Sequence, residues 1–558
     1  MPPRKPCLFL SLALTWAGCV AGSERGSATA LDVDDPPDLT AAAPDADTVE
    51  APDGDIGATE TAVDAVDGGD ATDALDAVDA VDVDDTVDDS GSVADDATTV
   101  DDATTQDTSV VATDALTSEV AVDVVASVDL PALGRALDDY LDHRYDAAAD
   151  ATTLMVHAIE QSGASFDQVE ALIRGGRQSY PDVSALVGHV SERPLACDHV
   201  DYASSYFLAV PAGYDPSVAT PVAVIAHGGS VPMDIDDARA AASDDLDAYR
   251  PELEARGMIV IAPVTTRGWS PIGDSVVFTA LSDLSRHFHI DPDRIVVAGH
   301  LMGGHMTWRS AITQGDRYAA VAPASGGYVT WPDDGRLGNL FGSHGFQTWC
   351  ATEPYDLRQA NLLIRAWIVE RGYDWRARDL AGDSHLPSEA MPDMAAFFAG
   401  VRRDMYPSDA YLWGGGSMRY DANWAGQTET IYSDRAYRWN ERYWLELTPN
   451  PGASGPLEAF ASVLDAHTLS IVSNHVRALR IYLHPDMGID FSGSFRVIVN
   501  DQVRYDGPIV EDMAGMLELV REWDDRGRLY RGHVDVTVAT DRVVGAPHAD
   551  PDHDAVGP

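Results

Sequence analysis

Residues 291–305 read DPDRIVVAGHLMGGH, and this stretch decides the fold of the central part of the chain. The segment 294–298, which is apolar after Arg294, has the length and the β-branched composition of a buried strand. A helical stretch is expected at 303–314, almost directly after the strand. Gly299 and Gly303 flank the connection and relieve the crowding of a sharp turn. The stretch therefore predicts a strand that leads through a strained turn at Leu301 into a helix.

The same alternation of strand and helix extends over residues 190–410. Further strands are expected at 206–210, 222–226, 258–262, 319–322, 347–351 and 375–380, and further helices at 275–288, 357–371 and 389–402. Strands that alternate with helices form a mostly parallel sheet with helices on both faces. The central domain is therefore predicted to be α/β. The segments 231–255 and 327–346 carry no readable motif and are predicted to be loops.

A second motif, His227-Gly228-Gly229, ends the strand expected at 222–226. With the turn at Leu301 and the order of the elements, it resembles the α/β-hydrolases, in their esterase and prolyl-oligopeptidase-like branches. These include polyhydroxybutyrate depolymerases, feruloyl esterases and dienelactone hydrolases, whose turn reads Gly-His-Ser-Met-Gly-Gly. The resemblance covers roughly residues 200–403 and implies an α/β-hydrolase fold.

The resemblance implies a degenerate nucleophile. Leu301 stands where the family has its catalytic serine, and it offers neither a proton to abstract nor a lone pair for attack. The backbone N–H groups of Gly228, Gly229 and Met302 correspond to the oxyanion hole. In serine hydrolases, loss of the serine costs on the order of a millionfold in turnover. The resemblance therefore implies a hydrolase fold with impaired catalysis.

The other two members of the family's triad have candidates further along the chain. His385 lies in the loop after the last expected strand, where the family has its base. Asp356 corresponds to the carboxylate that orients the base, and the order nucleophile, acid, base agrees with this fold. The family usually shows His-Gly-x-x-Asp before that carboxylate, whereas this chain reads CATEPYD at 350–356. The match for Asp356 is therefore looser than the match for the turn.

Other chemistry at the site has weaker support in the sequence. Ser230 and Ser325 are the alternative nucleophiles, but neither lies on a strand-to-helix turn, so each is interpreted as a loop serine. His300 and His305 flank the turn without the cysteines or acidic cluster that a zinc site requires. No metal and no cofactor are therefore expected.

Residues 1–19 have the pattern of a bacterial export signal. Arg4 and Lys5 precede an apolar run at 7–18, which is too short to span a bilayer. Ala-Gly-Cys at its end resembles the lipobox of bacterial lipoproteins, although Trp16 stands where that motif usually has leucine. The resemblance implies lipidation of Cys19 and a location at the cell envelope. Simple secretion is the alternative.

Residues 20–128 are predicted to be a disordered stalk rich in Asp, Ala, Thr and Val. Residues 21–130 hold 31 acidic residues against one arginine, and so account for more than half of the net charge of −54. Repulsion between like charges and the lack of aromatic residues prevent burial from offsetting the entropy of ordering. Glycine and glutamate are not spaced as calcium-binding loops require, so a solvated tether is favoured. The charge excludes a nucleic-acid binder that depends on phosphate contacts.

Two cysteines remain after the N-terminal pair, Cys197 and Cys350. In an oxidising compartment an even pair indicates a structural disulfide, and two unpaired buried thiols are the alternative.

Two further segments flank the central domain. Residues 129–189 have helical spacing and are predicted to be short helices packed onto the next domain. Residues 435–541 read mostly as strands, with a tight turn at 500–501, and are predicted to form a small β-domain before a flexible tail at 542–558. Trp439, Tyr443 and Trp444 are interpreted as core residues of that domain.

The sequence leaves three functional hypotheses open. The first is an exported pseudo-hydrolase that acts by binding or in structure, with a small ester, a peptide or a polymer as its ligand. The second is an active ester or peptide hydrolase with another nucleophile. The third is an adhesion or display protein that binds through its C-terminal β-domain. The sequence does not determine the oligomeric state, and a lipid anchor is the only membrane contact expected.

Overall fold

The computed structural model describes residues 128–142 and 150–548, apart from 198–199, 201, 231, 267, 270, 328–335, 354, 383–385, 415–439, 452, 454, 540, 543 and 546. The chain divides into two units, Met1–Leu116 and Thr117–Pro558, and every described residue belongs to the second. The predicted export signal, Cys19, nearly all of the predicted stalk and His385 therefore lie outside the described residues. Within the described ranges, no helix is long and apolar enough to cross a membrane.

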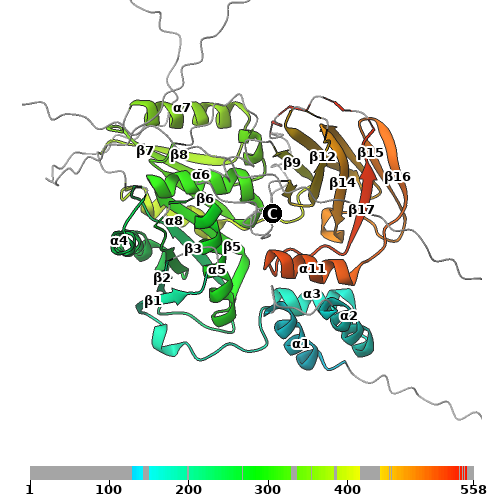
Figure 1. Cartoon of the computed structure of the whole chain (residues 1–558), viewed down its shortest axis with the longest axis horizontal. Coiled ribbons are helices and arrows are strands. Elements are labelled where there is room, and N and C mark those ends of the chain that lie inside the picture. The colour runs from blue at the N-terminus through cyan, green and yellow to red at the C-terminus, as the bar shows by residue number, and fades with distance from the viewer. Residues whose placement is uncertain are drawn as a thin grey trace, which may run out of the picture. The chain divides into compact units, whose positions relative to one another are not determined.

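An eight-stranded sheet is built from strands between residues 190 and 380 (Figure 1). Its order is β1-β2-β4-β3-β5-β6-β7-β8. The strands are β1 (Val190–Leu195), β2 (Ser204–Ala209), β3 (Thr220–Ala226), β4 (Ile259–Pro263), β5 (Ile290–His300), β6 (Ala320–Ala324), β7 (Gly345–Cys350) and β8 (Trp375–Leu380). The first two strands are antiparallel to their neighbours, and β3 to β8 are parallel. This is the strand arrangement of the α/β-hydrolase fold.

Helices cover both faces of this sheet because its strands are apolar on both sides. On one face, Val224 packs in a core with α5 (Pro271–His287), α6 (Met302–Gln314) and α7 (Tyr355–Glu370). On the other, Ile225 packs with α4 (Ile235–Glu254) and α8 (Met391–Gly400). The predicted fold class is confirmed. The prediction of a loop at 231–255 is wrong, because α4 occupies most of that segment.

Among the described residues, the C-terminal β-domain forms two sheets. The five-stranded sheet has the order β16-β15-β13-β12-β9, and the four-stranded sheet has the order β10-β11-β14-β17. The elements are β9 (Asp409–Gly414), β10 (Glu441–Arg442), β11 (Leu445–Pro449), β12 (Leu457–Asp465), β13 (Thr468–Asn474), β14 (Val476–Leu483), β15 (Ser494–Val499), β16 (Gln502–Pro508), α11 (Met513–Trp523) and β17 (Gly532–Thr537). The expected turn at Asn500 and Asp501 is confirmed by positive φ angles of 50° and 64°.

The core of the β-domain bears on two sequence predictions. Tyr443 and Trp444 are buried in it, so they are core residues, whereas Trp439 lies outside the described residues. Strand β9 starts at residue 409, so the β-domain begins earlier than the predicted boundary at 435.

The N-terminal helices pack against a helix of the β-domain. These helices, α1 (Leu130–Asp142), α2 (Ala151–Ser162) and α3 (Phe166–Arg174), share one apolar core with α11, and Figure 1 shows the four together. In that core Leu137 and Ile173 pack with Leu517. Their apolar core therefore lies against the β-domain, while polar contacts such as the ion pair of Arg174 with Asp293, at 3.0 Å, join them to the central domain.

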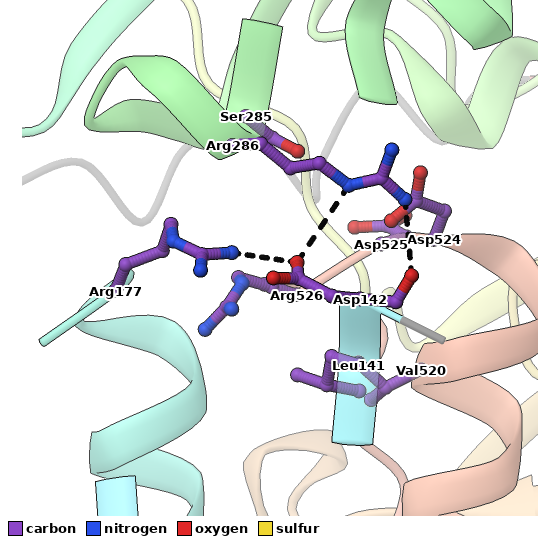
Figure 2. Close-up of a pocket in the computed structure, with 9 residues that line it drawn as sticks. All are labelled: Leu141, Asp142, Arg177, Ser285, Arg286, Val520, Asp524, Asp525 and Arg526. Carbon is purple, nitrogen blue, oxygen red and sulfur yellow. Dashed lines mark hydrogen bonds and ion pairs between the residues drawn. The ribbon is translucent and has the colours of Figure 1, made fainter. Parts of the chain in front are cut away.

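A small cavity lies where α1, α5 and α11 meet (Figure 2). Asp142 accepts a hydrogen bond from Arg177 at 2.6 Å, and Arg286 donates to the carbonyl of Asp142 at 3.2 Å. The cavity measures about 10 Å³, which is room for one water molecule. Arg286 is the next-to-last residue of α5, four positions before β5 begins, whereas Leu301 directly follows the other end of β5.

The predicted disulfide is absent, because Cys197 and Cys350 are not bonded to each other. Cys197 follows the edge strand β1, whereas Cys350 ends β7, and five strands lie between these two in the sheet. Strands are spaced at about 4.8 Å, and a disulfide requires Cα atoms closer than about 7 Å. The pairing inferred from the even number of cysteines is therefore wrong.

Candidate functional site

Leu301 lies at the turn between β5 and α6 in a strained backbone conformation. Its φ is 50° and its ψ is −114°, values that L residues rarely adopt. Its N–H donates to the carbonyl of Ala324 at the end of β6, at 3.1 Å, and its carbonyl accepts from His305 N at 3.0 Å. The side chain is partly exposed. The structure thus has the sharp turn that the sequence predicts, with Leu301 at its centre.

Glycines permit this turn because backbone approaches backbone on both sides of it. A Cβ at Gly303 would lie 1.8 Å from the carbonyl oxygen of Ala226, at the end of β3. A Cβ at Gly299 would lie 2.5 Å from the same oxygen, and one at Gly304 would lie 2.5 Å from the carbonyl oxygen of Ala324. No side chain fits at these positions without displacing the neighbouring strands. The turn is therefore fixed between the ends of β3, β5 and β6.

The loop after β3 is fixed by His227, which is fully buried. Its Nδ1 donates to the carbonyl of Gly228 at 2.8 Å, and its Nε2 accepts from Thr265 N at 3.2 Å. These two bonds define the neutral tautomer with the proton on Nδ1. Burial lowers the pKa of His227, which favours the same neutral form. His227 therefore orders the loop and carries no charge at neutral pH.

Asp245, a buried residue of α4, links this loop to the end of β5. Its Oδ2 accepts the N–H of Gly228 at 3.0 Å and lies 3.3 Å from Nδ1 of His300. The imidazole of His300 lies over Gly228, since a Cβ there would be 2.7 Å from its Nε2. An N–H that donates to a carboxylate is not available to a substrate oxygen. The candidate oxyanion hole is therefore corrected to Gly229 and Met302, without Gly228.

Glu353 is a buried carboxylate that the sequence analysis did not select. It follows β7 by three residues and is 6% exposed. Its Oε1 accepts the N–H of Cys350 at 2.9 Å. Its Oε2 is also buried and has no hydrogen-bond partner among the residues that the structure describes. A buried carboxylate oxygen requires a donor, so a further group is expected beside it.

The remaining candidate residues are placed as follows. Asp356 is the second residue of α7, where only its backbone is described, and His385 lies outside the described residues. Ser325 is 2% exposed, whereas Ser230 is exposed in the loop after Gly229. Burial lowers the pKa of His305 to about 4, so this residue is neutral at pH 7. In the part of the chain that the structure describes, no group of acidic, His and Cys side chains forms a metal site.

The chain is only distantly similar to known proteins. No protein-family model and no curated protein sequence matches the chain. Among solved structures, a thermostable esterase is 17% identical over 38% of this chain and 63% of its own, with a TM-score of 0.34. The S-formylglutathione hydrolase of Staphylococcus aureus is 15% identical over 38% of this chain and 100% of its own, with a TM-score of 0.30.

A ferulic acid esterase from Anaeromyces mucronatus is 13% identical over 38% of this chain and 90% of its own, with a TM-score of 0.30. The chain thus spans less than two thirds of the thermostable esterase. These likenesses are too weak to argue from, and the strand order of the central sheet is what establishes the α/β-hydrolase fold of this chain.

Proposed function

We propose that this protein is an exported pseudo-hydrolase, in which the α/β-hydrolase fold is retained for binding and the covalent chemistry is lost. The observation that carries the proposal is Leu301 in the strained turn between β5 and α6. That turn raises one side chain above the carboxyl ends of the strands, where hydrolases of this fold present an oxygen nucleophile. An isobutyl group there forms no covalent bond to a carbonyl carbon. It also occupies the space that an attacked carbonyl needs.

The backbone around the turn supports binding of a carbonyl compound. The N–H groups of Gly229 and Met302 are the candidate donors, and Met302 opens α6, where a helix favours a negatively polarised ligand atom. An ester, a peptide or a polymer with such linkages offers a carbonyl oxygen to these donors. We therefore propose that the ligand is an ester, a peptide or a polymer with such linkages, which the protein binds and does not cleave.

The two other triad positions are proposed from different evidence. His385 is proposed as the former catalytic base, and this proposal rests on sequence resemblance alone. For the carboxylate that would orient it, Glu353 has better support than Asp356. Glu353 follows β7 by three residues, and one of its buried oxygens lacks a partner among the described residues. Asp356 is already in α7, further from the end of the strand.

Export and lipidation of Cys19 remain part of the proposal and are supported by the sequence pattern at residues 1–19. A lipid anchor followed by a long acidic segment would hold the folded unit away from the membrane surface. Incorporation of a radioactive fatty acid into the protein in growing cells, compared between the native chain and Cys19→Ala, tests this part separately, and equal labelling of both would contradict lipidation at Cys19.

Labelling by a fluorophosphonate probe tests the loss of the nucleophile. The probe reacts with an activated serine, so the native full chain is expected to remain unlabelled, and Leu301→Ser is expected to label. Labelling of the native chain that Ser230→Ala abolishes would favour an active hydrolase over a pseudo-hydrolase, because Ser230 is the exposed serine nearest in sequence to the oxyanion loop.

A further inference from the structure

Side chains of the β-domain bind the C-terminal end of helix α6. The helix runs from Met302 to Gln314 and continues into a short 3-10 turn, Gly315–Arg317. Every residue from Met306 to Arg317 is buried. A helix end that is buried leaves backbone carbonyls without water, so it requires donors from elsewhere in the protein.

Arg442 of β10 supplies those donors. It is 1% exposed, and its guanidinium donates to the carbonyls of Ala311 and Ile312, at 3.5 and 3.4 Å. Its positive charge also lies at the negative end of the helix dipole, which is the favourable end for a cation. A Cβ at Gly315 would lie 2.5 Å from Nη2 of Arg442, so glycine makes the room that this guanidinium occupies.

Asp316 adds a buried ion pair directly after the helix. It is 1% exposed, accepts the backbone N–H of Tyr443 at 3.0 Å and pairs with Arg528. Arg528 in turn donates to the carbonyl of Tyr443 at 3.1 Å. The carboxylate, the guanidinium and the backbone of Tyr443 therefore satisfy one another in a closed ring. We call the contacts of Arg442, Asp316 and Arg528 the helix clamp.

The central domain in turn contributes an arginine to a helix end of the β-domain. Arg317, the residue after Asp316, donates to the carbonyl of Trp523 at 2.9 Å, and Trp523 is the last residue of α11. Its guanidinium lies 4.1 Å from the ring centre of Phe278 in α5. Each domain thus provides the arginine that closes a helix end of the other. These contacts therefore couple the C-terminal ends of α6 and α11.

We propose that the helix clamp is a positioning device for the strained turn at Leu301. A strained backbone conformation persists only where its surroundings over-determine it. At its N-terminal end, α6 is fixed by the contacts of Gly303 and Gly304 with β3 and β6. At the C-terminal end of α6 the helix clamp holds the helix in the same way, about 20 Å from the turn along the helix axis. The β-domain therefore holds the candidate site in shape. This inference goes beyond the proposed function and holds whether or not Leu301 abolishes catalysis.

Hydrogen exchange of the full chain, followed by mass spectrometry, tests the clamp. Arg442→Met keeps most of the side-chain length and removes the donors and the charge. We expect amides in residues 300–307 to exchange about tenfold faster in this variant, while residues 494–499 of β15 exchange as in the native chain. The matched control is Arg480→Met, since Arg480 pairs with Asp535 on the surface of the same domain and should leave both segments unchanged.

Two results would overturn the proposal: exchange at 300–307 that stays native in folded Arg442→Met, or an equal increase in both segments. If Arg442→Met does not fold, Arg442→Lys keeps the charge but lacks the planar guanidinium, whose Nη1 makes both bonds to the helix carbonyls. It is then expected to raise exchange at 300–307 selectively, by a smaller factor, and native exchange in that variant would equally refute the clamp.

Discussion

Replacing Gly303 by alanine tests the packing of the turn most sharply, because two effects of opposite sign compete. Gly303 lies in the first turn of α6, where alanine favours the helix by up to about 1 kcal/mol over glycine. The new Cβ, however, would lie 1.8 Å from the carbonyl oxygen of Ala226 and 2.6 Å from its carbon. Those atoms belong to backbone at the end of a central strand, so they cannot turn away as a flexible side chain would.

We expect the clash to prevail and Gly303→Ala to lose about 2 to 4 kcal/mol of unfolding free energy. Urea unfolding, followed by tryptophan fluorescence and far-ultraviolet circular dichroism, measures the loss. The matched control is Gly400→Ala at the end of α8, where a Cβ meets no atom within 4 Å. This control should be as stable as the native chain or slightly more so. A Gly303→Ala variant as stable as Gly400→Ala would refute the close packing of the turn against β3.

Three further outcomes are expected. After unfolding without a reductant, Cys197 and Cys350 should each take up an alkylating reagent, and a peptide linked through both would contradict the absence of a bond between them. Burial opposes ionisation of Glu170, yet hydrogen bonds from His484 and Arg531 outweigh it and lower the pKa of Glu170 to about 2. The carboxylate therefore stabilises the fold above its ordinary pKa near 4.5, and this stabilisation is lost as the pH falls towards 2. Glu170→Gln should accordingly cost about 2 kcal/mol at pH 7 and much less at pH 2, and an equal cost at both would refute this. Arg528→Met should destabilise the chain by about 3 to 5 kcal/mol in urea, because it leaves the carboxylate of Asp316 buried and unpaired, and a loss below about 1 kcal/mol would show that the pair is dispensable.

The central sheet was predictable because its strands are buried on both faces. Such strands appear as short apolar runs, and the expected range 375–380 coincides with β8. The turn at Leu301 was predictable because its glycines are required by backbone contacts, which leave a signature in the sequence. Both features are local, so the residues that define them are neighbours in the chain.

Helix α4 escaped prediction because of its composition. Its buried face is built largely from small residues, including Ala238 and Ala242, among many aspartates. Alanine gives little contrast between the faces of a helix, although Leu246, Tyr249 and Leu253 continue the same face. The segment therefore appeared as a polar loop, and with it the contact of Asp245 with the oxyanion loop was missed.

Long-range partners also escaped prediction. Asp316 and Arg528 are more than two hundred positions apart, and nothing in either local sequence indicates that they pair. Glu353 and Asp356 lie three residues apart after β7, so spacing alone did not distinguish them. The distinction came from burial and from an oxygen without a partner among the described residues. Sequence pattern identified the domain, whereas the contacts of single carboxylates required the three-dimensional structure.

Hydrolysis of a p-nitrophenyl ester by the purified full chain, with Leu301→Ser measured beside it, tests the central claim most directly. The account predicts no enzymatic turnover by the native chain and clear turnover by Leu301→Ser, since a missing serine accounts for a loss on the order of a millionfold. Enzymatic turnover by the native chain at a rate that Leu301→Ser does not increase would contradict it, because the nucleophile would then lie elsewhere.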